Sequence, residues 1–220
     1  MTTVIYIIRH AEAEGNKYRI FHGTSDSDLT PNGLLQARKA AEALMELGIE
    51  KIYASDLKRA YKTARIFSDM SGIGITISKA LREIDGGLWE NKTWRALEDI
   101  FPEEYNTWEN MPHNHRMPSG ESMEELQKRA YEELERIAVA DPGKTVAVFT
   151  HGTFIRVLLC KLTNRPFDQL INVKWHENTA ITKIVYDNGK FSMEFEGNYD
   201  HLDLSMATVY NQDWIRKQED

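Results

Sequence analysis

Two short runs of β-branched and aromatic residues constrain the fold of this chain most. Val4–Ile8 reads Val-Ile-Tyr-Ile-Ile, and Thr145–Thr150 reads Thr-Val-Ala-Val-Phe-Thr. Neither run alternates between apolar and polar residues, so each predicts a strand that is buried on both faces. A shorter run of the same kind lies at Ile52–Ala54. Strands buried on both faces occur in mainly parallel sheets with helices on either side, so the sequence predicts an α/β fold.

Helical patterns follow these runs. Thr30 and a first-turn proline begin an amphipathic stretch that Gly48 ends. Ser55 or Asp56 is expected to cap a second helix, and Ser122–Glu125 forms a capping box at the start of a third. A fourth helix is expected over Thr153–Leu162. The alternation of strand and helix signals supports the α/β assignment.

The C-terminal part of the chain contains a hairpin signal. Residues 180–186 and 191–195 are strand-like and flank Asp187-Asn188-Gly189, a sequence that favours a tight turn. This predicts an antiparallel addition to the sheet. Residues 86–121, with three tryptophans and three prolines, are expected to form a helical or irregular insertion. No internal repeat or linker is visible, so residues 1–220 are predicted to form a single domain.

Charge and cysteine content exclude several function classes. The chain has 27 Lys and Arg against 34 Asp and Glu, a net charge of −7. This balance argues against nucleic acid or an anionic membrane as the main partner. Cys160 is the single cysteine, so neither an internal disulfide nor a cysteine-based zinc site is possible. Residues 1–8 lack a signal-peptide layout, no apolar run is long enough to span a membrane, and a soluble, cytoplasmic protein is expected.

Both buried strands end in a histidine, within Arg9-His10 and His151-Gly152. In an open α/β sheet, ligands bind at the carboxyl ends of the strands. A single histidine there is more simply explained as part of the core, but two at equivalent strand ends indicate a site. Arg59 lies in the first turn of the helix after the third strand, where a cation opposes the helix dipole. Its guanidinium matches phosphate oxygens, so these residues predict a pocket for a dianionic phosphoryl group.

Such a pocket needs a proton donor for the departing alcohol. Glu83 and Asp85 both follow an apolar stretch, and the residues alone do not choose between them. A carboxylic acid that stays protonated near neutral pH needs desolvation, which the aromatic segment from Trp89 onward is expected to supply. His113-Asn114-His115 resembles a pair of metal ligands, but no acidic or cysteine partner adjoins it. No metal site or cofactor is therefore predicted.

In their order along the chain, these blocks resemble the histidine phosphatase superfamily, in its phosphoglycerate-mutase-like branch. The matching residues are Arg9-His10 with Glu12 and Asn16; Gly23 through Asp28-Leu29-Thr30, Gly33 and Gln36-Ala37; Ser55-Asp56-Leu57 with Arg59-Ala60 and Thr63-Ala64; Leu81-Arg82-Glu83 with Gly87 and Trp89-Glu90; Ser119-Gly120-Glu121-Ser122; and Thr150-His151-Gly152. The resemblance implies a three-layer α/β/α sandwich and a two-step mechanism without metal.

The resemblance also implies catalytic roles. His10 would attack phosphorus and carry the phosphoryl group, with its other ring nitrogen held protonated by a backbone carbonyl. Arg9, Arg59 and His151 would bind the phosphoryl oxygens, and Glu83 would protonate the departing oxygen and then activate water.

Candidate binding residues surround this set. Asn16 would add a hydrogen bond to the phosphoryl group, and Ser122 is a candidate for the pocket mouth as well as a helix cap. The other candidates for phosphate or substrate binding are His22, Gly23, Thr24 and Gly152. Ala11 departs from the family by replacing a glycine, which would strain the backbone only if φ were positive there. Thr153 also replaces a glycine.

The glutamate block separates phosphatase from mutase. Glu83-Ile84-Asp85-Gly86-Gly87-Leu88-Trp89 resembles phosphatase members more than the Glu-Arg-His-Tyr-Gly pattern of mutases. The stretch from Glu83 to His151 is also short for enclosing a bisphosphorylated intermediate. We therefore expect a phosphomonoester hydrolase acting on small phosphorylated metabolites, as a monomer or homodimer. The alternatives are a phosphoglycerate mutase and a catalytically silent phosphate-binding protein.

Overall fold

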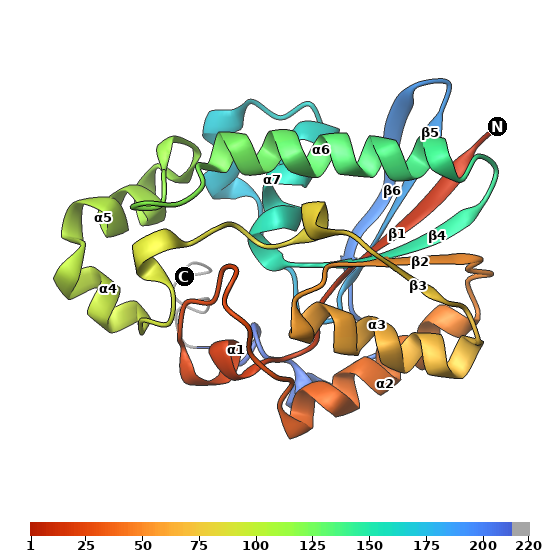
Figure 1. Cartoon of the computed structure of the whole chain (residues 1–220), viewed down its shortest axis with the longest axis horizontal. Helices are drawn as coiled ribbons and strands as arrows, with labels where there is room; N and C mark the ends of the chain where they lie inside the picture. Colours follow the sequence, from red (N-terminus) through yellow and green to blue (C-terminus); the bar gives the residue numbers. More distant parts are fainter. Residues whose placement is uncertain (213–220) are drawn as a thin grey trace.

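The computed structural model describes residues 1–212 of the 220-residue chain (Figure 1). The strands are β1 (Thr3–Arg9), β2 (Lys51–Ala54), β3 (Ile75–Ile77), β4 (Thr145–Thr150), β5 (Ile181–Asp187) and β6 (Lys190–Asn198). The α-helices are α1 (Glu14–Tyr18), α2 (Pro31–Met45), α3 (Lys58–Ser71), α4 (Trp94–Ile100), α5 (Pro102–Asn110), α6 (Met123–Ala140) and α7 (Gly152–Leu162). Short 3₁₀ turns connect several of these elements.

The six strands form one sheet in the order β3-β2-β4-β1-β5-β6. β3, β2, β4 and β1 are parallel, and β5 and β6 are antiparallel to their neighbours. Arg9 pairs with Thr150, so the two histidines that follow these residues leave the sheet at the same edge. The predicted mainly parallel sheet with an antiparallel C-terminal addition is confirmed.

Alternating residues of the central strands face two separate cores. Ile5 and Ile7 of β1 pack with the apolar faces of α6 and α7. Tyr6 and Ile8 pack instead with α2 and α3, on the opposite face of the sheet. Figure 1 shows α6 and α7 on one side of the sheet and α2 and α3 on the other. The α/β/α sandwich that the continuous apolar runs and the family resemblance predicted is therefore confirmed.

The local capping signals are mostly confirmed. The Thr30 hydroxyl accepts a hydrogen bond from the Gly33 N–H at 2.9 Å, and Ser122 forms a reciprocal capping box with Glu125. Asn188 and Gly189 have φ values of +49° and +77°, the left-handed pair that a two-residue hairpin turn requires.

The predicted cap of α3 is wrong. The N-cap is Leu57, which has no capping side chain. Asp56 instead accepts two hydrogen bonds from the Arg82 guanidinium, and the first N–H of the helix, at Lys58, donates to Asp26. Both partners lie more than 20 positions from the helix start, so the local sequence does not reveal them.

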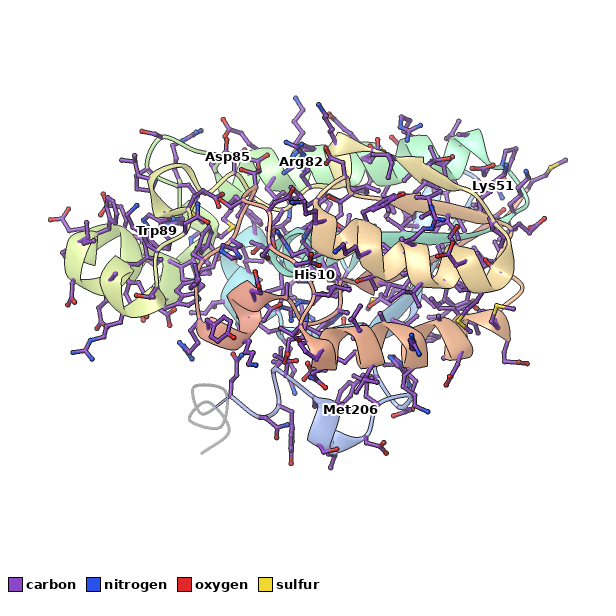
Figure 2. The ribbon with its side chains drawn as sticks, turned by 60° about the horizontal axis from the view of Figure 1, so that its bottom comes forward. His10, Lys51, Arg82, Asp85, Trp89 and Met206 are labelled. Atoms are coloured by element: carbon purple, nitrogen blue, oxygen red, sulfur yellow. The ribbon has the colours of Figure 1, made fainter. Side chains whose placement is uncertain are left out.

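Residues 86–121 contain α4 and α5, which lie at the end of the molecule where β1 and β4 finish (Figure 1). They pack around Trp89, whose side chain is fully buried. Phe21 and Trp108 contact its ring, each with centroids 5.7 Å away. Figure 2 places Trp89 at the opposite end of the molecule from Lys51, the first residue of β2. This segment therefore stands beside the carboxyl ends of the strands, where the candidate site lies.

Candidate active site

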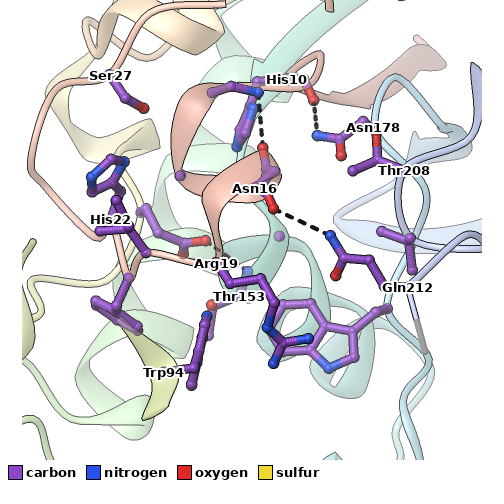
Figure 3. Close-up of a pocket in the computed structure, with 18 of the residues that line it drawn as sticks. His10, Asn16, Arg19, His22, Ser27, Trp94, Thr153, Asn178, Thr208 and Gln212 are labelled. Carbon is purple, nitrogen blue, oxygen red and sulfur yellow. Dashed lines mark hydrogen bonds between the residues drawn. The ribbon is translucent and has the colours of Figure 1, made fainter. Parts of the chain in front are cut away.

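A cavity of about 190 Å³ lies at the carboxyl ends of β1 and β4 (Figure 3). Four of the five predicted catalytic side chains, Arg9, His10, Arg59 and Glu83, line it directly. They come from β1, α3 and the segment after β3, and each is at most 7% exposed. The fold thus brings together charged groups that are distant in sequence, and it holds them away from bulk water.

His10 is fixed as a neutral imidazole. Its Nδ1 lies 2.8 Å from the backbone oxygen of Ala11. Because a carbonyl only accepts hydrogen bonds, Nδ1 carries the proton and Nε2 keeps its lone pair. Burial, together with the charges of Arg59 and Arg9, holds the pKa of His10 well below its usual value. The expected backbone carbonyl partner is therefore present, and the chemistry available to Nε2 is that of a nucleophile.

His151, the fifth predicted catalytic residue, does not line the cavity itself but lies directly beside His10, with ring centroids 5.3 Å apart. It is fully buried, and burial followed by the charge of Arg59 holds its pKa well below the usual value. Neither of its ring nitrogens makes a hydrogen bond within residues 1–212. Buried polar atoms without partners are rare, so this ring is suited to hydrogen bond with a ligand.

Arg9 and Arg59 supply the positive charge. One Arg9 nitrogen donates to the His176 carbonyl, while its buried Nε has no hydrogen-bond partner in the part of the chain that the structure describes. Arg59 donates to the carbonyls of Ser25 at 2.9 Å and Gly23 at 2.6 Å. Burial lowers the pKa of Arg59 to about 10, which leaves it protonated at neutral pH. Two guanidinium groups beside two neutral imidazoles make the site attractive to an anion.

The structure separates the two candidate acids that the sequence left open. Glu83 lines the cavity, and its carboxylate accepts backbone N–H bonds from Thr153 at 2.8 Å and from Ile84 and Phe154 at 3.0 Å each. Thr153 and Phe154 belong to the first turn of α7, which follows directly on His151. Asp85, labelled in Figure 2, is exposed; it lines a neighbouring depression that Glu83 also borders, but it does not line the cavity. Of the two candidates, only Glu83 shares this cavity with His10.

Three of the predicted binding residues also line the cavity: Asn16, His22 and Gly152. The Asn16 side-chain oxygen accepts from the Ala13 N–H at 3.0 Å, a hydrogen bond within the first turn of α1. A Cβ on Gly152 would lie 3.3 Å from Arg9 Nε and 3.1 Å from a ring atom of Trp175. Glycine after the second histidine therefore leaves room for the Arg9 side chain.

The other three predicted binding residues do not line this cavity. The carboxylate of Glu90 accepts the backbone N–H groups of Gly23 and Thr24, so both residues serve to anchor the loop. Thr24 contributes instead to the depression that contains Asp85. The hydroxyl of Ser122 is engaged as a helix cap. Nothing in the local sequence distinguishes these loop and cap roles from ligand binding.

Sequence reasoning missed a C-terminal contribution to the cavity. Asn178, Thr208 and Gln212 all line it. The Asn178 amide donates to the backbone oxygen of His10 at 2.7 Å, and the Gln212 amide donates to the Asn16 carbonyl at 3.2 Å (Figure 3). Asn178 stands just before a predicted strand, and this position is the one signal that could have suggested it.

The departures from the family pattern cause no strain. Neither Ala11 nor Thr153 has positive φ. Ala11 is fully buried and packs against Leu29 and Ala37. A glycine is therefore not required by the backbone at either position.

No metal centre forms among residues 1–212, since no three His, Cys, Asp or Glu side chains converge there. His115 is packed against the rings of Trp89 and Trp108, at 5.0 Å and 5.5 Å between centroids. Cys160 is fully buried in α7, as expected for a core residue. Over the same residues, no helix is long and apolar enough to cross a membrane.

The sequence is similar to those of curated proteins that are named as phosphatases or phosphoglycerate mutases. A protein of Hydrogenobacter thermophilus named "Putative phosphoserine phosphatase 2" is 34% identical over 191 residues, covering 87% of this chain and 93% of that protein. "Probable phosphoglycerate mutase GpmB" of an Enterobacter species is 33% identical over 204 residues, covering 90% and 94%.

Among solved structures, YhfR of Bacillus stearothermophilus superposes with a TM-score of 0.88 at 31% identity, covering 91% of this chain and all of that one. The sequence model of the histidine phosphatase superfamily (branch 1) matches residues 5–198. This match reaches from β1 to β6. It includes the four predicted catalytic residues that line the cavity, Arg9, His10, Arg59 and Glu83. The chain therefore belongs to branch 1 of the histidine phosphatase superfamily.

Proposed function

We propose that this protein is a metal-independent phosphatase that hydrolyses phosphomonoesters of small metabolites through a phosphohistidine on His10. The observation that carries the proposal is the protonation state of His10. Its Nδ1 is held by the Ala11 carbonyl, so Nε2 presents a lone pair in a cavity that also contains Arg9, Arg59 and Glu83. A neutral nucleophile, two cations and one carboxylic acid are the groups that transfer of a phosphoryl group from an ester requires.

In the first step, the lone pair of His10 Nε2 forms a bond to phosphorus while the ester P–O bond breaks. Arg9 and Arg59 stabilise the charge on the phosphoryl oxygens, and His151 donates a hydrogen bond to the same group. Glu83 donates a proton to the departing oxygen, so the product leaves as a neutral alcohol and Glu83 becomes a carboxylate.

In the second step, water attacks phosphorus and the P–N bond breaks. The Glu83 carboxylate accepts the proton of the attacking water, and the electron pair of the broken bond returns to His10 Nε2. Inorganic phosphate leaves, and both residues regain their starting protonation states. Glu83 therefore acts first as an acid and then as a base, from the position that its three backbone hydrogen bonds fix.

The relatives support a phosphatase that acts on small molecules. Their names include phosphoserine phosphatase, and the structure of an Entamoeba histolytica phosphoserine phosphatase mutant in complex with phosphoserine is 25% identical with a TM-score of 0.79. A cavity of about 190 Å³ is small compared with pockets for drug-sized ligands, which occupy about 300–1,000 Å³. Both facts favour small phosphorylated metabolites as substrates.

Phosphoglycerate mutase is the second candidate, because relatives with 31–33% identity carry that name. A mutase must keep water away from the phosphohistidine and return the phosphoryl group to a second alcohol. The segment around Glu83 lacks the Glu-Arg-His-Tyr-Gly pattern of mutases, so we favour hydrolysis.

The deciding experiment measures phosphate release from a panel of phosphorylated metabolites and from p-nitrophenyl phosphate, with isomerisation of 3-phosphoglycerate followed in parallel. We expect hydrolysis that a chelator does not inhibit, and a His10→Ala variant that folds but loses activity by roughly 10⁴-fold or more. Acid-labile labelling of the wild type by ³²P-phosphoester, absent in His10→Ala, identifies the intermediate. Near-normal turnover in folded His10→Ala would refute the mechanism, and isomerisation faster than hydrolysis would establish a mutase.

We further propose a single domain over residues 1–220, a cytoplasmic location, a monomeric or homodimeric state, and neither nucleic acid nor membrane as partner. The net charge of −7 and the single cysteine support these assignments.

A further inference from the structure

The part of the cavity that the insertion provides is aromatic. Trp94 of α4, Tyr105 and Trp108 of α5, and Trp175 line it, and we call these four residues the aromatic wall. Ring centroids of Trp94 and Trp108 are 5.6 Å apart, and those of Trp108 and Trp175 are 6.5 Å apart. Mutual packing of the rings, with Trp89 behind them, makes this wall a fixed surface rather than a set of mobile side chains.

One carboxylate stands on the same wall. Glu109 follows Trp108 on α5 and lines the cavity, where it remains exposed to solvent at the rim. It forms no ion pair with any residue in the range 1–212. Aromatic faces carry partial negative charge, so both the Glu109 carboxylate and the rings of the aromatic wall attract a cation.

The aromatic wall already contacts one cation of the protein. The Arg156 guanidinium lies 4.3 Å from the centroid of the Trp175 ring. Hydrogen bonds to the carbonyls of Val173 and Leu170 hold it there, and Arg156 does not line the cavity. A cation–π contact at this indole is therefore sterically and energetically feasible in this fold.

The two parts of the cavity thus offer different partners to a ligand. Arg9 and Arg59 supply positive charge beside His10, whereas the aromatic wall, Glu109 and Arg19 belong to the other part of the lining. A ligand that pairs with Arg9, Arg59 and Glu109 carries a phosphate at one end and a positive charge at the other.

We propose that Glu109 and the aromatic wall bind an ammonium group on the alcohol part of the substrate, so that phosphomonoesters of amino alcohols are preferred. This inference rests on the phosphatase function proposed above and names its substrate class. Partial desolvation raises the pKa of Glu109, whereas the charges of Arg156 and Arg19 lower it. A bound ammonium would act in the same direction as these two arginines, because a nearby positive charge stabilises the ionised carboxylate.

Arg19 provides the competing hypothesis, because it also lines the cavity and its guanidinium favours a substrate carboxylate. Three esters with the same two-carbon chain separate the possibilities: O-phosphoethanolamine ends in an ammonium, 2-hydroxyethyl phosphate in a hydroxyl, and 2-phosphoglycolate in a carboxylate. For each ester, kcat/KM is measured at low ionic strength and again in about 0.5 M NaCl, which screens exposed charge pairs.

In the wild type, we expect kcat/KM to be highest for the ester that ends in an ammonium, lower for the hydroxyl ester and lowest for the carboxylate ester. Intrinsic differences between the leaving groups cancel when the ammonium-to-hydroxyl ratio is compared between variants. Glu109→Gln should lower this ratio about fivefold, the size expected for a charge pair at a solvent-exposed rim, and salt should lower the wild-type ratio in the same direction. The matched control is Glu103→Gln, an exposed residue of α5 that does not line the cavity, and it should leave the ratio unchanged.

An ammonium-to-hydroxyl ratio that is equal in wild type and Glu109→Gln would overturn the proposal. Fastest hydrolysis of 2-phosphoglycolate would also overturn it and would assign the rim to Arg19. If the wild type hydrolyses none of these esters and no p-nitrophenyl phosphate, the phosphatase function itself fails, so the two failures are distinguishable.

Discussion

Replacing Glu83 by glutamine tests the proposed mechanism at its most specific point. The substitution keeps the size of the side chain and removes its ability to donate and accept the catalytic proton. In the structure, the two carboxylate oxygens accept three backbone N–H bonds, from Ile84, Thr153 and Phe154. The glutamine oxygen can replace only one of the two carboxylate oxygens, and its amide nitrogen cannot accept a hydrogen bond.

The structural effect is therefore at least one unsatisfied buried N–H group at the start of α7. Such a group costs about 1–3 kcal/mol, so the free energy of unfolding of Glu83→Gln should fall by this amount. The chemical effect is larger and depends on the leaving group. General acid catalysis contributes about 10²–10⁴-fold, or roughly 2.7–5.4 kcal/mol, when the alcohol is a poor leaving group.

The assay measures kcat/KM for a series of phosphomonoesters whose alcohols differ in acidity, from alkyl alcohols to p-nitrophenol. The wild type should depend weakly on the leaving group, because Glu83 protonates it. Glu83→Gln should lose about 10²–10⁴-fold on alkyl esters and much less on p-nitrophenyl phosphate, which needs little protonation.

Asp85→Asn is the matched control, since residue pattern alone did not separate Asp85 from Glu83 before the family resemblance named Glu83, and the structure places Asp85 outside the cavity. Equal losses by Glu83→Gln on alkyl and p-nitrophenyl esters would refute the acid role. Leaving-group-dependent losses in Asp85→Asn would show that the structure has selected the wrong carboxylate.

Three further predictions concern other residues. Arg59→Ala should lower kcat/KM by about 10²–10³-fold, by analogy with the 2.7–4 kcal/mol of a lost oxyanion donor, and Arg59→Lys should recover part of this; a raised KM with unchanged kcat would contradict transition-state stabilisation. Ser122→Ala should lower the free energy of unfolding by about 1 kcal/mol in urea titrations, because it removes the cap of α6, and an unchanged midpoint would refute that role. Burial lowers the pKa of His115 from 6.5 to about 4, so below pH 6.5 the unfolded chain binds a proton that the folded chain does not. His115 should contribute a fall in the free energy of unfolding of up to about 3 kcal/mol between pH 6.5 and 4, in addition to the falls from His10, His151 and His176, whose pKa values are also lowered. His115→Gln should make the pH dependence of urea unfolding curves correspondingly shallower; an equally steep dependence in the variant would assign the effect elsewhere.

Much of the fold could be predicted because its signals are local. A strand buried on both faces must be apolar throughout, and Val4–Ile8 and Thr145–Thr150 show this without reference to the rest of the chain. Turn and cap residues are also local, as the Asn188-Gly189 turn and the Ser122 capping box confirm. Parallel pairing of adjacent strands then brings the two terminal histidines to one edge.

The cap of α3 shows where local signals fail. Asp56 has the chemistry of an N-cap, but the Arg82 guanidinium engages both of its oxygens from 26 positions away. Thr24 likewise has the chemistry of a ligand-binding residue, yet its hydroxyl and N–H bind Glu90. In each case a distant partner decides which of two plausible hydrogen bonds a side chain makes.

The sequence by itself determined the layers, the sheet edge and the chemistry available there, because burial and capping leave a pattern in neighbouring residues. The family resemblance named Glu83, but only the tertiary structure showed that Glu83 and not Asp85 lines the cavity with His10, and that Trp94, Trp108 and Glu109 line the same cavity. It also brought Asn178 and Thr208 to the site from the C-terminal part of the chain. These choices depend on backbone N–H groups and packing between segments far apart in sequence, and such contacts have no periodicity for a single sequence to reveal.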